Sequence, residues 1–184
     1  PLYHLKMDDY HKPAYRIDED GNQVEEMWSL FSKDEMVGYL AQRQYWRSDE
    51  DQNVAHIARH SIRFLEEIDR NKPFFLWIDS FDPHEPWDAP SIYDPEKKCP
   101  YDPDYDGQEI WNPVSTYADN VYTDREMAHI RALYAEKVTN VDKYIGKVLD
   151  RIRTLGLEQS TMIVLMADHG EPLGNGTHGH GIVR

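Results

Sequence analysis

An acid and an imidazole stand side by side where an apolar run of the chain ends. Residues 162–167 are Met, Ile, Val, Leu, Met and Ala, and Asp168 and His169 follow them directly. A carboxylate oxygen and an imidazole nitrogen both bind divalent cations, and Gly170 lets the backbone turn away sharply. Metal sites generally take at least three protein ligands, so the pair predicts half of a metal site. The alternative is that Asp168 caps a turn and His169 packs beside it.

His84 follows a second apolar run, residues 74–78, and lies between Pro83 and Pro86. The two prolines restrict the backbone, so the imidazole is held close to the end of that run. Such a histidine suits donation of a hydrogen bond to an anion or a leaving group near neutral pH. The alternative is a loop histidine whose ring bonds a backbone carbonyl. We interpret Trp87 as a packing residue rather than a platform for substrate.

Two further motifs resemble metal sites less closely. The stretch "DPDYDG", residues 102–107, has aspartates at the spacing of an EF-hand calcium loop. The twelfth position is Pro113, where that loop needs a bidentate glutamate, so we favour a solvated acidic turn. His178 and His180 in "HGHG" suggest zinc, but two histidines this close in a glycine-rich loop are more typical of a flexible surface.

The elements that would position His84 are a helix and a strand. Apolar residues recur at helical spacing from about Asp49 to Asp69, and Ser48 can cap the start. The run 74–78 is too short for an independent helix, and it favours a strand buried on both faces.

The elements before Asp168 repeat this order. After a long loop over about 80–122, Thr123 and Glu126 have capping-box spacing and begin a helix with one apolar stripe, which Gly156 ends. Residues 162–167 then predict a second buried strand. Helix, strand, loop, helix and strand indicate an α/β fold with a mainly parallel sheet flanked by helices.

In such a sheet, ligands bind beyond the carboxyl ends of the strands. If residues 74–79 and 162–167 are neighbouring or near-neighbouring parallel strands, His84, Asp168 and His169 gather at one edge. The helix between them can serve as a right-handed crossover.

Composition excludes several classes of protein. The chain has 184 residues with a hydrophobic share of 40%, which is typical of one globular domain. A net charge of −14 and a pI near 4.9 argue against nucleic-acid binding, which needs a basic surface. Cys99 is the single cysteine, so no intrachain disulfide forms. No run is long enough to span a membrane and no signal peptide is recognisable, while the compartment stays open.

Two longer stretches resemble one known family. "KPFFLWIDSFDPHEPWDAP" and "YAEKVTNVDKYIGKVLDRIRTLGLEQSTMIVLMADHGEPLGNGTHGHG" are similar to the sulfatases of the alkaline phosphatase superfamily, which also includes phosphonate monoester and phosphodiester hydrolases. A strand followed by D-P-H-x-P and a strand followed by D-H-G-E occur in the family's order, with its "VDxxIGxxLD" helix between them. The match covers the chain from about Asn71 to the end.

The resemblance implies a metal-dependent hydrolase of sulfate esters. Asp168 and His169 match metal ligands of the family, and His84 matches the histidine that contacts the sulfuryl or phosphoryl group. The implied cation is calcium, with manganese or zinc as alternatives. The implied substrate is a small-molecule or carbohydrate sulfate ester, and the oligomeric state stays open.

The chain also departs from the family pattern. The family nucleophile is a formylglycine made from cysteine or serine in a C-x-P-S-R-like signature, and Cys99 in "CPYDP" does not match it. Asp8 and Asp9 follow a poor strand, so they are not assigned to the family's early metal pair. We therefore expect residues 1–184 to be part of one sulfatase-like catalytic domain, with an irregular polar segment over 1–47, an α/β core over 48–184 and the formylglycine outside this chain.

Two alternative functions stay open. A phosphodiester or phosphonate monoester hydrolase uses the same scaffold and the same Asp-His pair. A binding module that has lost catalysis is the alternative from another class. The chain as given is expected to be inactive, because it lacks the nucleophile.

Overall fold

The computed structural model describes residues 15–17, 23–25, 39, 41, 43, 45–93, 97–107, 109–113 and 122–173. Two helices dominate this part of the chain, α2 (Asn53–Glu67) and α3 (Asp124–Thr154). Its other elements are short: the antiparallel strands β1 (Tyr15–Ile17) and β2 (Gln23–Glu25), and the 3-10 helices η3 (Asp49–Asp51), η4 (Pro90–Tyr93) and η6 (Glu158–Ser160).

The second predicted helix is confirmed with both of its ends. The Thr123 side chain accepts a hydrogen bond from the Glu126 N–H at 3.2 Å, and Glu126 Oε2 accepts one from the Thr123 N–H at 2.8 Å. This reciprocal pair is the capping box that starts α3. Gly156, at a φ of 71°, allows the left-handed turn after the helix. No helix in the described ranges is long and apolar enough to cross a membrane.

The first predicted helix is divided into two pieces. Ser48 caps η3 as expected, but the chain leaves helical geometry at Gln52, whose φ and ψ are −70° and 154°. The Gln52 side chain is buried and bonded to Asn140 and to the backbone of Asp88. These contacts explain why α2 begins only after Gln52.

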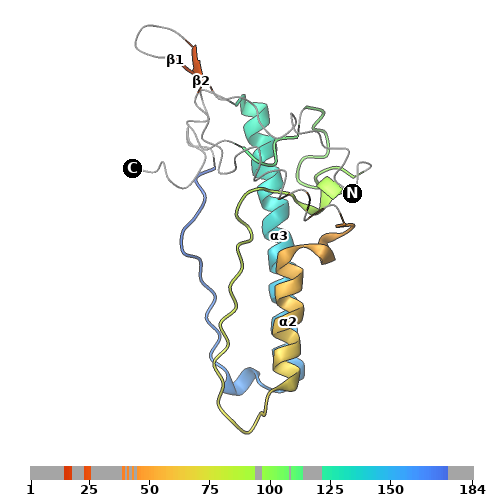
Figure 1. The fold of residues 1–184 in the computed structure, drawn as a ribbon, viewed down its shortest axis with the longest axis vertical. Coiled ribbons are helices and arrows are strands. Elements are labelled where there is room, and N and C mark those ends of the chain that lie inside the picture. Colours follow the sequence, from red (N-terminus) through yellow and green to blue (C-terminus); the bar gives the residue numbers. More distant parts are fainter. Residues whose placement is uncertain are drawn as a thin grey trace.

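Helices α2 and α3 pack against each other over the lower half of the molecule in Figure 1. Both run downward, and the extended segments that follow them, from about residue 73 and residue 161, both return upward. The buried cluster between the helices contains Val54, Ala55, Ala58, Leu65, Tyr144, Val148, Ile152 and Leu157. This helix-down, segment-up order is the chain path of an α/β fold.

The loop after residue 80 forms a second core with the first half of α3. Trp87 and Trp111 are completely buried there, so Trp87 is a packing residue as predicted. The remaining buried members of this cluster are Ile92, Cys99, Ile110, Tyr122, Met127, Ile130, Ala132 and Leu133.

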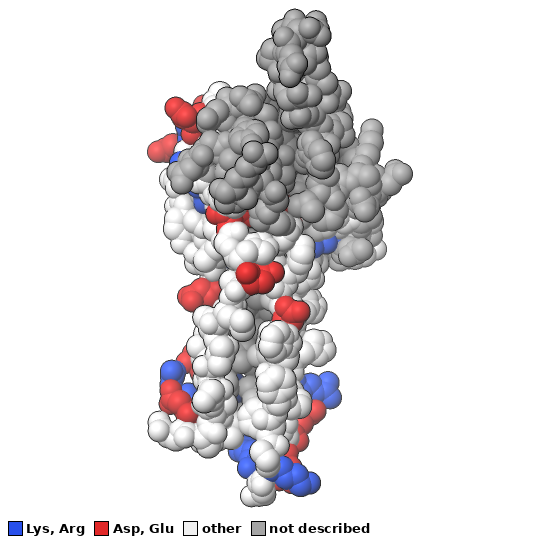
Figure 2. All heavy atoms as spheres, turned by 90° about the vertical axis from the view of Figure 1, so that its left-hand side faces the viewer, with Lys and Arg blue, Asp and Glu red and all other residues white. Residues whose placement is uncertain are grey.

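The prediction of two buried strands is wrong for the described part of the chain. Residues 74–79 and 161–167 are extended, but neither belongs to a sheet among the residues that the structure describes, where β1 and β2 form the one sheet. Phe74 and Leu76 pack against the α2–α3 cluster, whereas the alternating Phe75 is 83% exposed. In the other segment Met162 is 90% exposed. Figure 2 faces this side, and its lower half shows an uncharged surface bordered by charged side chains.

The physical reason is that an apolar run indicates that its side chains favour burial, but it does not indicate whether a helix or another strand buries them. Helix packing satisfies one face of residues 74–78, and no neighbouring strand in the described part of the chain covers the other. The direction of the two segments agrees with the parallel arrangement that we expected, but the predicted ladder is not formed.

Candidate functional site

His84 lies on a compact loop directly after the first extended segment. Its backbone N–H donates to the Phe81 carbonyl at 3.0 Å, and the Phe81 ring stacks on the imidazole with a centroid distance of 4.1 Å. Trp87 Nε1 donates to the Pro83 carbonyl at 3.0 Å, which closes the loop around His84. The histidine side chain is therefore held by its own loop, as the flanking prolines predicted.

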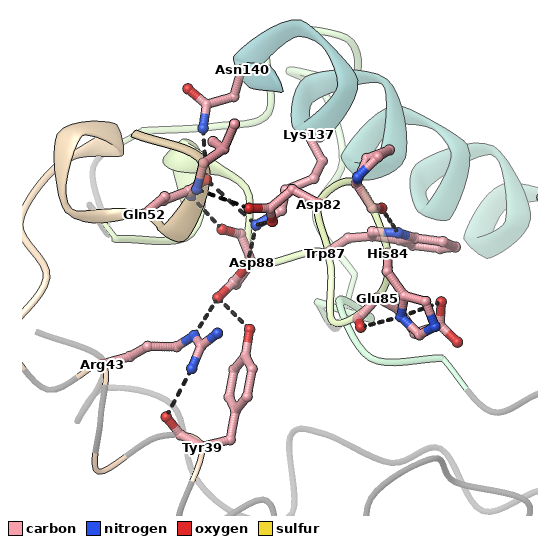
Figure 3. A network of polar contacts seen from close by, with 12 residues as sticks. Tyr39, Arg43, Gln52, Asp82, His84, Glu85, Trp87, Asp88, Lys137 and Asn140 are labelled. Atoms are coloured by element: carbon pink, nitrogen blue, oxygen red, sulfur yellow. Dashed lines mark hydrogen bonds and ion pairs between the residues drawn. The ribbon is translucent and has the colours of Figure 1, made fainter. Parts of the chain in front are cut away.

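A buried lysine on α3 binds this loop on both sides of His84 (Figure 3). Lys137 Nζ lies 2.9 Å from Asp82 Oδ1 and 2.7 Å from Asp88 Oδ1. The three side chains are almost completely shielded from solvent. One ammonium group therefore fixes the loop at the positions two residues before and four residues after His84.

The second oxygen of Asp88 binds a separate pair of donors. Arg43 Nε donates to Asp88 Oδ2 at 2.9 Å, and the Tyr39 hydroxyl donates to the same oxygen at 2.5 Å. Burial acts to raise the pKa of Asp88, but the charges of Lys137 and Arg43 outweigh it and hold that pKa below its usual value. Burial acts to lower the pKa of Lys137, and Asp88 and Asp82 outweigh it, so that pKa is raised.

Two amide side chains connect this group to both helices. Asn140 Nδ2 donates to Gln52 Oε1 at 2.6 Å, and Gln52 Nε2 donates to the Asp88 carbonyl at 2.8 Å. Asp82 Oδ2 accepts from the N–H of Val54 at the start of α2, at 3.1 Å. We call Tyr39, Arg43, Gln52, Asp82, Asp88, Lys137 and Asn140 the Lys137 network (Figure 3).

The imidazole of His84 faces two acceptors of the next residue. His84 Nδ1 lies 2.7 Å from the Glu85 carbonyl oxygen and 3.3 Å from Glu85 Oε2. The alternative interpretation of His84, a loop histidine bonded to a backbone carbonyl, therefore holds for the Nδ1 atom of its ring. It leaves a role for the ring in chemistry open, because imidazole has two distinct nitrogens.

Asp168 and His169 lie at the end of the second extended segment and are accessible. The His169 N–H donates to Asp168 Oδ1 at 3.0 Å, and His169 Nδ1 lies 2.9 Å from the Gly170 carbonyl. The Asp168 side chain is 89% exposed. The Gly170 carbonyl contributes most to a raised pKa of His169, against a small effect of desolvation, and the carboxylates of Asp168, Glu171 and Glu85 add to it.

The carboxylate of Glu85 connects the two loops electrostatically. Glu85 belongs to the His84 loop, and its charge acts on the imidazole of His169. Glu85, the neighbour of His84, is therefore within electrostatic range of His169, and the two loops follow extended segments that run in the same direction (Figure 1).

The donors of the Asp-His pair fit a divalent cation in type but not in number. A carboxylate and an imidazole are suitable ligands, and both side chains are accessible. In the described ranges, however, no group of three or more His, Cys, Asp or Glu side chains is arranged to hold a metal. His178, His180, Asp8 and Asp9, as well as most of the polar segment 1–47, lie outside the described residues.

Asp102, the first residue of the acidic stretch 102–107, forms ion pairs with residues of α3. Asp102 receives two hydrogen bonds from Arg125, at 2.5 and 2.8 Å, and lies 2.9 Å from Nδ1 of the buried His129. His129 Nε2 lies 2.8 Å from Glu109 Oε2, and the Tyr105 ring stacks on its imidazole. These contacts occupy the carboxylate of Asp102, the first position of the calcium-loop pattern.

Cys99 also behaves as a structural residue. It is 3% exposed, and burial raises the pKa of its thiol to about 11. A thiol with so little thiolate at neutral pH is a poor nucleophile, which agrees with the mismatch of "CPYDP" to the family signature.

Sequence reasoning missed Glu85 and the residues that hold the His84 loop. Lys137, Asn140 and Gln52 lie 36 or more residues from the groups that they bind, so no local spacing connects them. One signal was present: Glu136, Lys137 and Asn140 are polar residues inside the apolar stripe of α3, and all three are buried. Polar residues at buried helix positions indicate partners on another element.

His84 on its loop and the accessible Asp168–His169 pair are the candidate site residues that the structure describes. Comparison with known proteins gives the class: the Sulfatase family model matches residues 6–184, and the chain belongs to this family. An arylsulfatase of Clostridium perfringens is 26% identical over 127 residues, covering 65% of this chain and 26% of that protein. An endo-4-O-sulfatase of Bacteroides thetaiotaomicron is 29% identical over 107 residues, which cover 57% of this chain and 20% of that protein.

A third relative is named for broader chemistry. The multifunctional alkaline phosphatase superfamily protein PehA of Trinickia caryophylli is 26% identical over 137 residues, covering 62% of this chain and 26% of that protein. The chain thus spans about a quarter or less of the length of these curated relatives. No solved structure is significantly similar to it. Family membership implies an α/β fold and supports sulfuric ester hydrolysis in general.

Proposed function

We propose that the whole protein hydrolyses sulfate esters of small molecules or carbohydrates, and that this chain supplies part of its active site. The observation that carries the proposal is the placement of His84 and the Asp168–His169 pair at the ends of two extended segments that run in the same direction, in a chain of the sulfatase family. The nucleophile, a formylglycine, is expected outside this chain.

Asp168 and His169 would hold a divalent cation together with ligands from elsewhere in the protein. Calcium is the proposed ion, with manganese or zinc as alternatives. When bound, the cation would supply Lewis-acid polarisation of the ester oxygens and a positive field in an acidic chain. The Asp168 carboxylate contributes an anionic oxygen, and His169 contributes an imidazole nitrogen, which must be neutral to bind.

His84 would contact the transferring sulfuryl group. A hydrogen-bond donor at this point stabilises negative charge as it develops on the oxygens of the group. Such stabilisation depends on a fixed position, because donors that must reorient give back part of the gain. The closed loop and the Lys137 network fix that position in this chain.

The test is turnover by the whole protein with an aryl sulfate. The His84→Ala and Asp168→Ala variants should each lose roughly 100-fold or more in kcat/KM if both residues act on the reacting group or its cation. The 184-residue chain should show no turnover above background. Clear turnover by this chain, lost in His84→Ala, would show that the nucleophile lies within it.

A phosphodiester or phosphonate monoester hydrolase is the second candidate. The similarity to PehA, whose name describes a multifunctional member of the alkaline phosphatase superfamily, favours it. Parallel assays with an aryl phosphonate monoester and a phosphodiester, each in the presence of calcium, manganese or zinc, separate the two activities. Absence of turnover with every substrate would favour a binding module.

A further inference from the structure

Arg131 on α3 bonds the loop that follows the Asp168–His169 pair. Its Nε atom donates a hydrogen bond to the Leu173 carbonyl at 3.1 Å. A guanidinium group does not lose its proton in proteins, so it is a donor at every working pH. The Leu173 side chain also packs against the hydrophobic cluster that contains Trp87. The loop is therefore attached to the first half of α3 by a hydrogen bond and by apolar packing.

The connection from Leu173 back to His169 is short and restricted. Pro172 fixes its own φ angle and limits the conformation of the residue before it. The Leu173 N–H donates to the Glu171 carbonyl at 3.0 Å, which closes a tight turn around Pro172. Only four positions separate Leu173 from His169, so the attachment at Leu173 restricts the position of His169.

Tyr134, three residues after Arg131 on α3, has neighbours from both site loops. Its ring meets the Trp87 ring of the His84 loop edge to face, with a centroid distance of 5.4 Å. Burial raises the pKa of Tyr134, and the charge of Glu171 raises it further. Glu171, from the second loop, is therefore within electrostatic range of Tyr134.

Lys137, three residues further along α3, binds Asp82 and Asp88 at 2.9 and 2.7 Å. Residues three apart are neighbours on a helix surface, so Arg131, Tyr134 and Lys137 form a continuous row, which we call the α3 row. Its ends are about 9 Å apart along the axis, at 1.5 Å per residue. The two extended segments that lead to the site loops form no ladder with each other in the described part of the chain. The α3 row instead joins both loops to one rigid helix.

We propose that Arg131 is a positioning residue, which fixes the Asp168–His169 pair relative to His84. It acts through the Leu173 carbonyl, while Lys137 holds the other loop, so that α3 sets the separation of the two halves of the site. Fixed separation matters for catalysis, because a displacement of about 1 Å can cost about 100-fold in rate. The role of the pair as cation ligands rests on the proposed function, whereas its attachment to α3 does not.

The first experiment uses the 184-residue chain and needs no turnover. Arg131→Met keeps much of the length of the side chain but removes the hydrogen-bond donor. Backbone order parameters from ¹⁵N relaxation should therefore fall for residues 169–173 in this variant. Rigid backbone has an order parameter of about 0.85, and flexible backbone has one below about 0.6. Unchanged values in the variant, or values below about 0.6 in the unmodified chain, would overturn the proposal.

Arg125→Met is the matched control. Arg125 is also an accessible arginine of α3 that bonds a loop, but its partner is Asp102, which lies outside both site loops. The order parameters of residues 169–173 should stay unchanged in this variant. The bond of Arg131 is exposed, so Arg131→Met should lower the Tm by no more than about 4 °C. A larger fall, with lower order parameters throughout α3, would make Arg131 a general structural residue and overturn the proposal.

The second experiment measures activation of the EDTA-treated whole protein by calcium, manganese or zinc, with an aryl sulfate as substrate. Loss of a group that orients metal ligands typically costs about 10-fold to 100-fold in metal affinity. The half-activating concentration of the cation should rise by that factor in Arg131→Met and stay unchanged in Arg125→Met. Lower order parameters with an unchanged cation dependence would overturn the role of Arg131 in the site. If the unmodified protein has no sulfatase activity, the proposed function fails, and the order parameters alone decide whether Arg131 positions the pair.

Discussion

Lys137 Nζ lies 2.7 Å from Asp88 Oδ1, although the two residues are 49 positions apart in the chain. Lys137 belongs to α3, and Asp88 ends the loop that carries His84. The same nitrogen lies 2.9 Å from Asp82 Oδ1, at the other end of that loop. The position of His84 therefore depends on a helix residue that has no direct contact with its ring among the interactions described above.

Substitution of Lys137 should be strongly destabilising. Lys137→Met removes the ammonium and leaves two buried carboxylates to depend on their remaining donors. Breaking a buried ion pair by removing one partner typically costs about 3–5 kcal/mol. Urea unfolding followed by tryptophan fluorescence measures the loss, and a change below about 1 kcal/mol would show that Asp82 and Asp88 are satisfied without Lys137.

Lys143→Met is the control for this substitution. Lys143 also lies on α3 and pairs with Asp49 of η3, but its side chain is 48% exposed. Exposed ion pairs contribute about 0–1 kcal/mol, so this variant should unfold almost like the unmodified chain. Equal losses in the two variants would point to the propensity of α3 rather than to the Lys137 network.

Acid should weaken the network through Asp88. The pKa of Asp88 is lower in the folded chain than its ordinary value, so the folded state binds this proton more weakly than the unfolded state does. The stability contributed by Asp88 is therefore complete above the unfolded pKa, about 4, and is lost as the pH falls through the folded pKa. Unfolding free energies between pH 3 and pH 6 should fall less steeply in Asp88→Asn than in the unmodified chain.

Cys99 should be protected from thiol reagents. A thiol whose pKa is about 11 has roughly a hundredfold less thiolate at pH 8 than an ordinary cysteine, and burial also blocks access. We expect the disulfide reagent DTNB to react at least 100-fold more slowly with the folded chain than with the chain in urea. Equal rates would mean that the core around Trp87 and Trp111 opens readily.

Divalent cations should bind this chain weakly. Asp168 and His169 are adjacent, but no third ligand joins them within the described ranges. Each missing ligand leaves coordination to water, so the cation gains little over its hydrated state. Calorimetric titration with calcium and with manganese should give affinities weaker than micromolar. A tighter affinity that is lost in Asp168→Ala would show that this chain holds a complete site.

The helices were predictable because their signals are local. The capping box of Thr123 and Glu126 and the apolar stripe after it lie within a single element, and α3 begins and ends where they indicate. The division of the first helix was not predictable, since Gln52 leaves helical geometry for partners 36 and 88 residues away.

The residue types of the candidate site were predictable from the sequence. The residues that hold the His84 loop in place were not. Prolines beside His84 and the glycine after His169 indicated where these side chains end their segments, and the structure holds them there. The prediction of two buried strands was wrong because hydrophobicity does not indicate whether a helix or another strand packs against an apolar segment. Glu85 was missed because a charged residue in a polar loop carries no sign of burial in its own sequence.

The length of α3 has a consequence for how the molecule opens. The helix spans about 46 Å at 1.5 Å per residue, and its two ends enter different hydrophobic clusters, with Lys137 between them. One continuous helix thus belongs to two units of local unfolding. Amide hydrogen exchange along α3 should show two levels of protection that change near Lys137, and the unit containing Tyr144 and Val148 should be able to open while the loop around His84 stays closed.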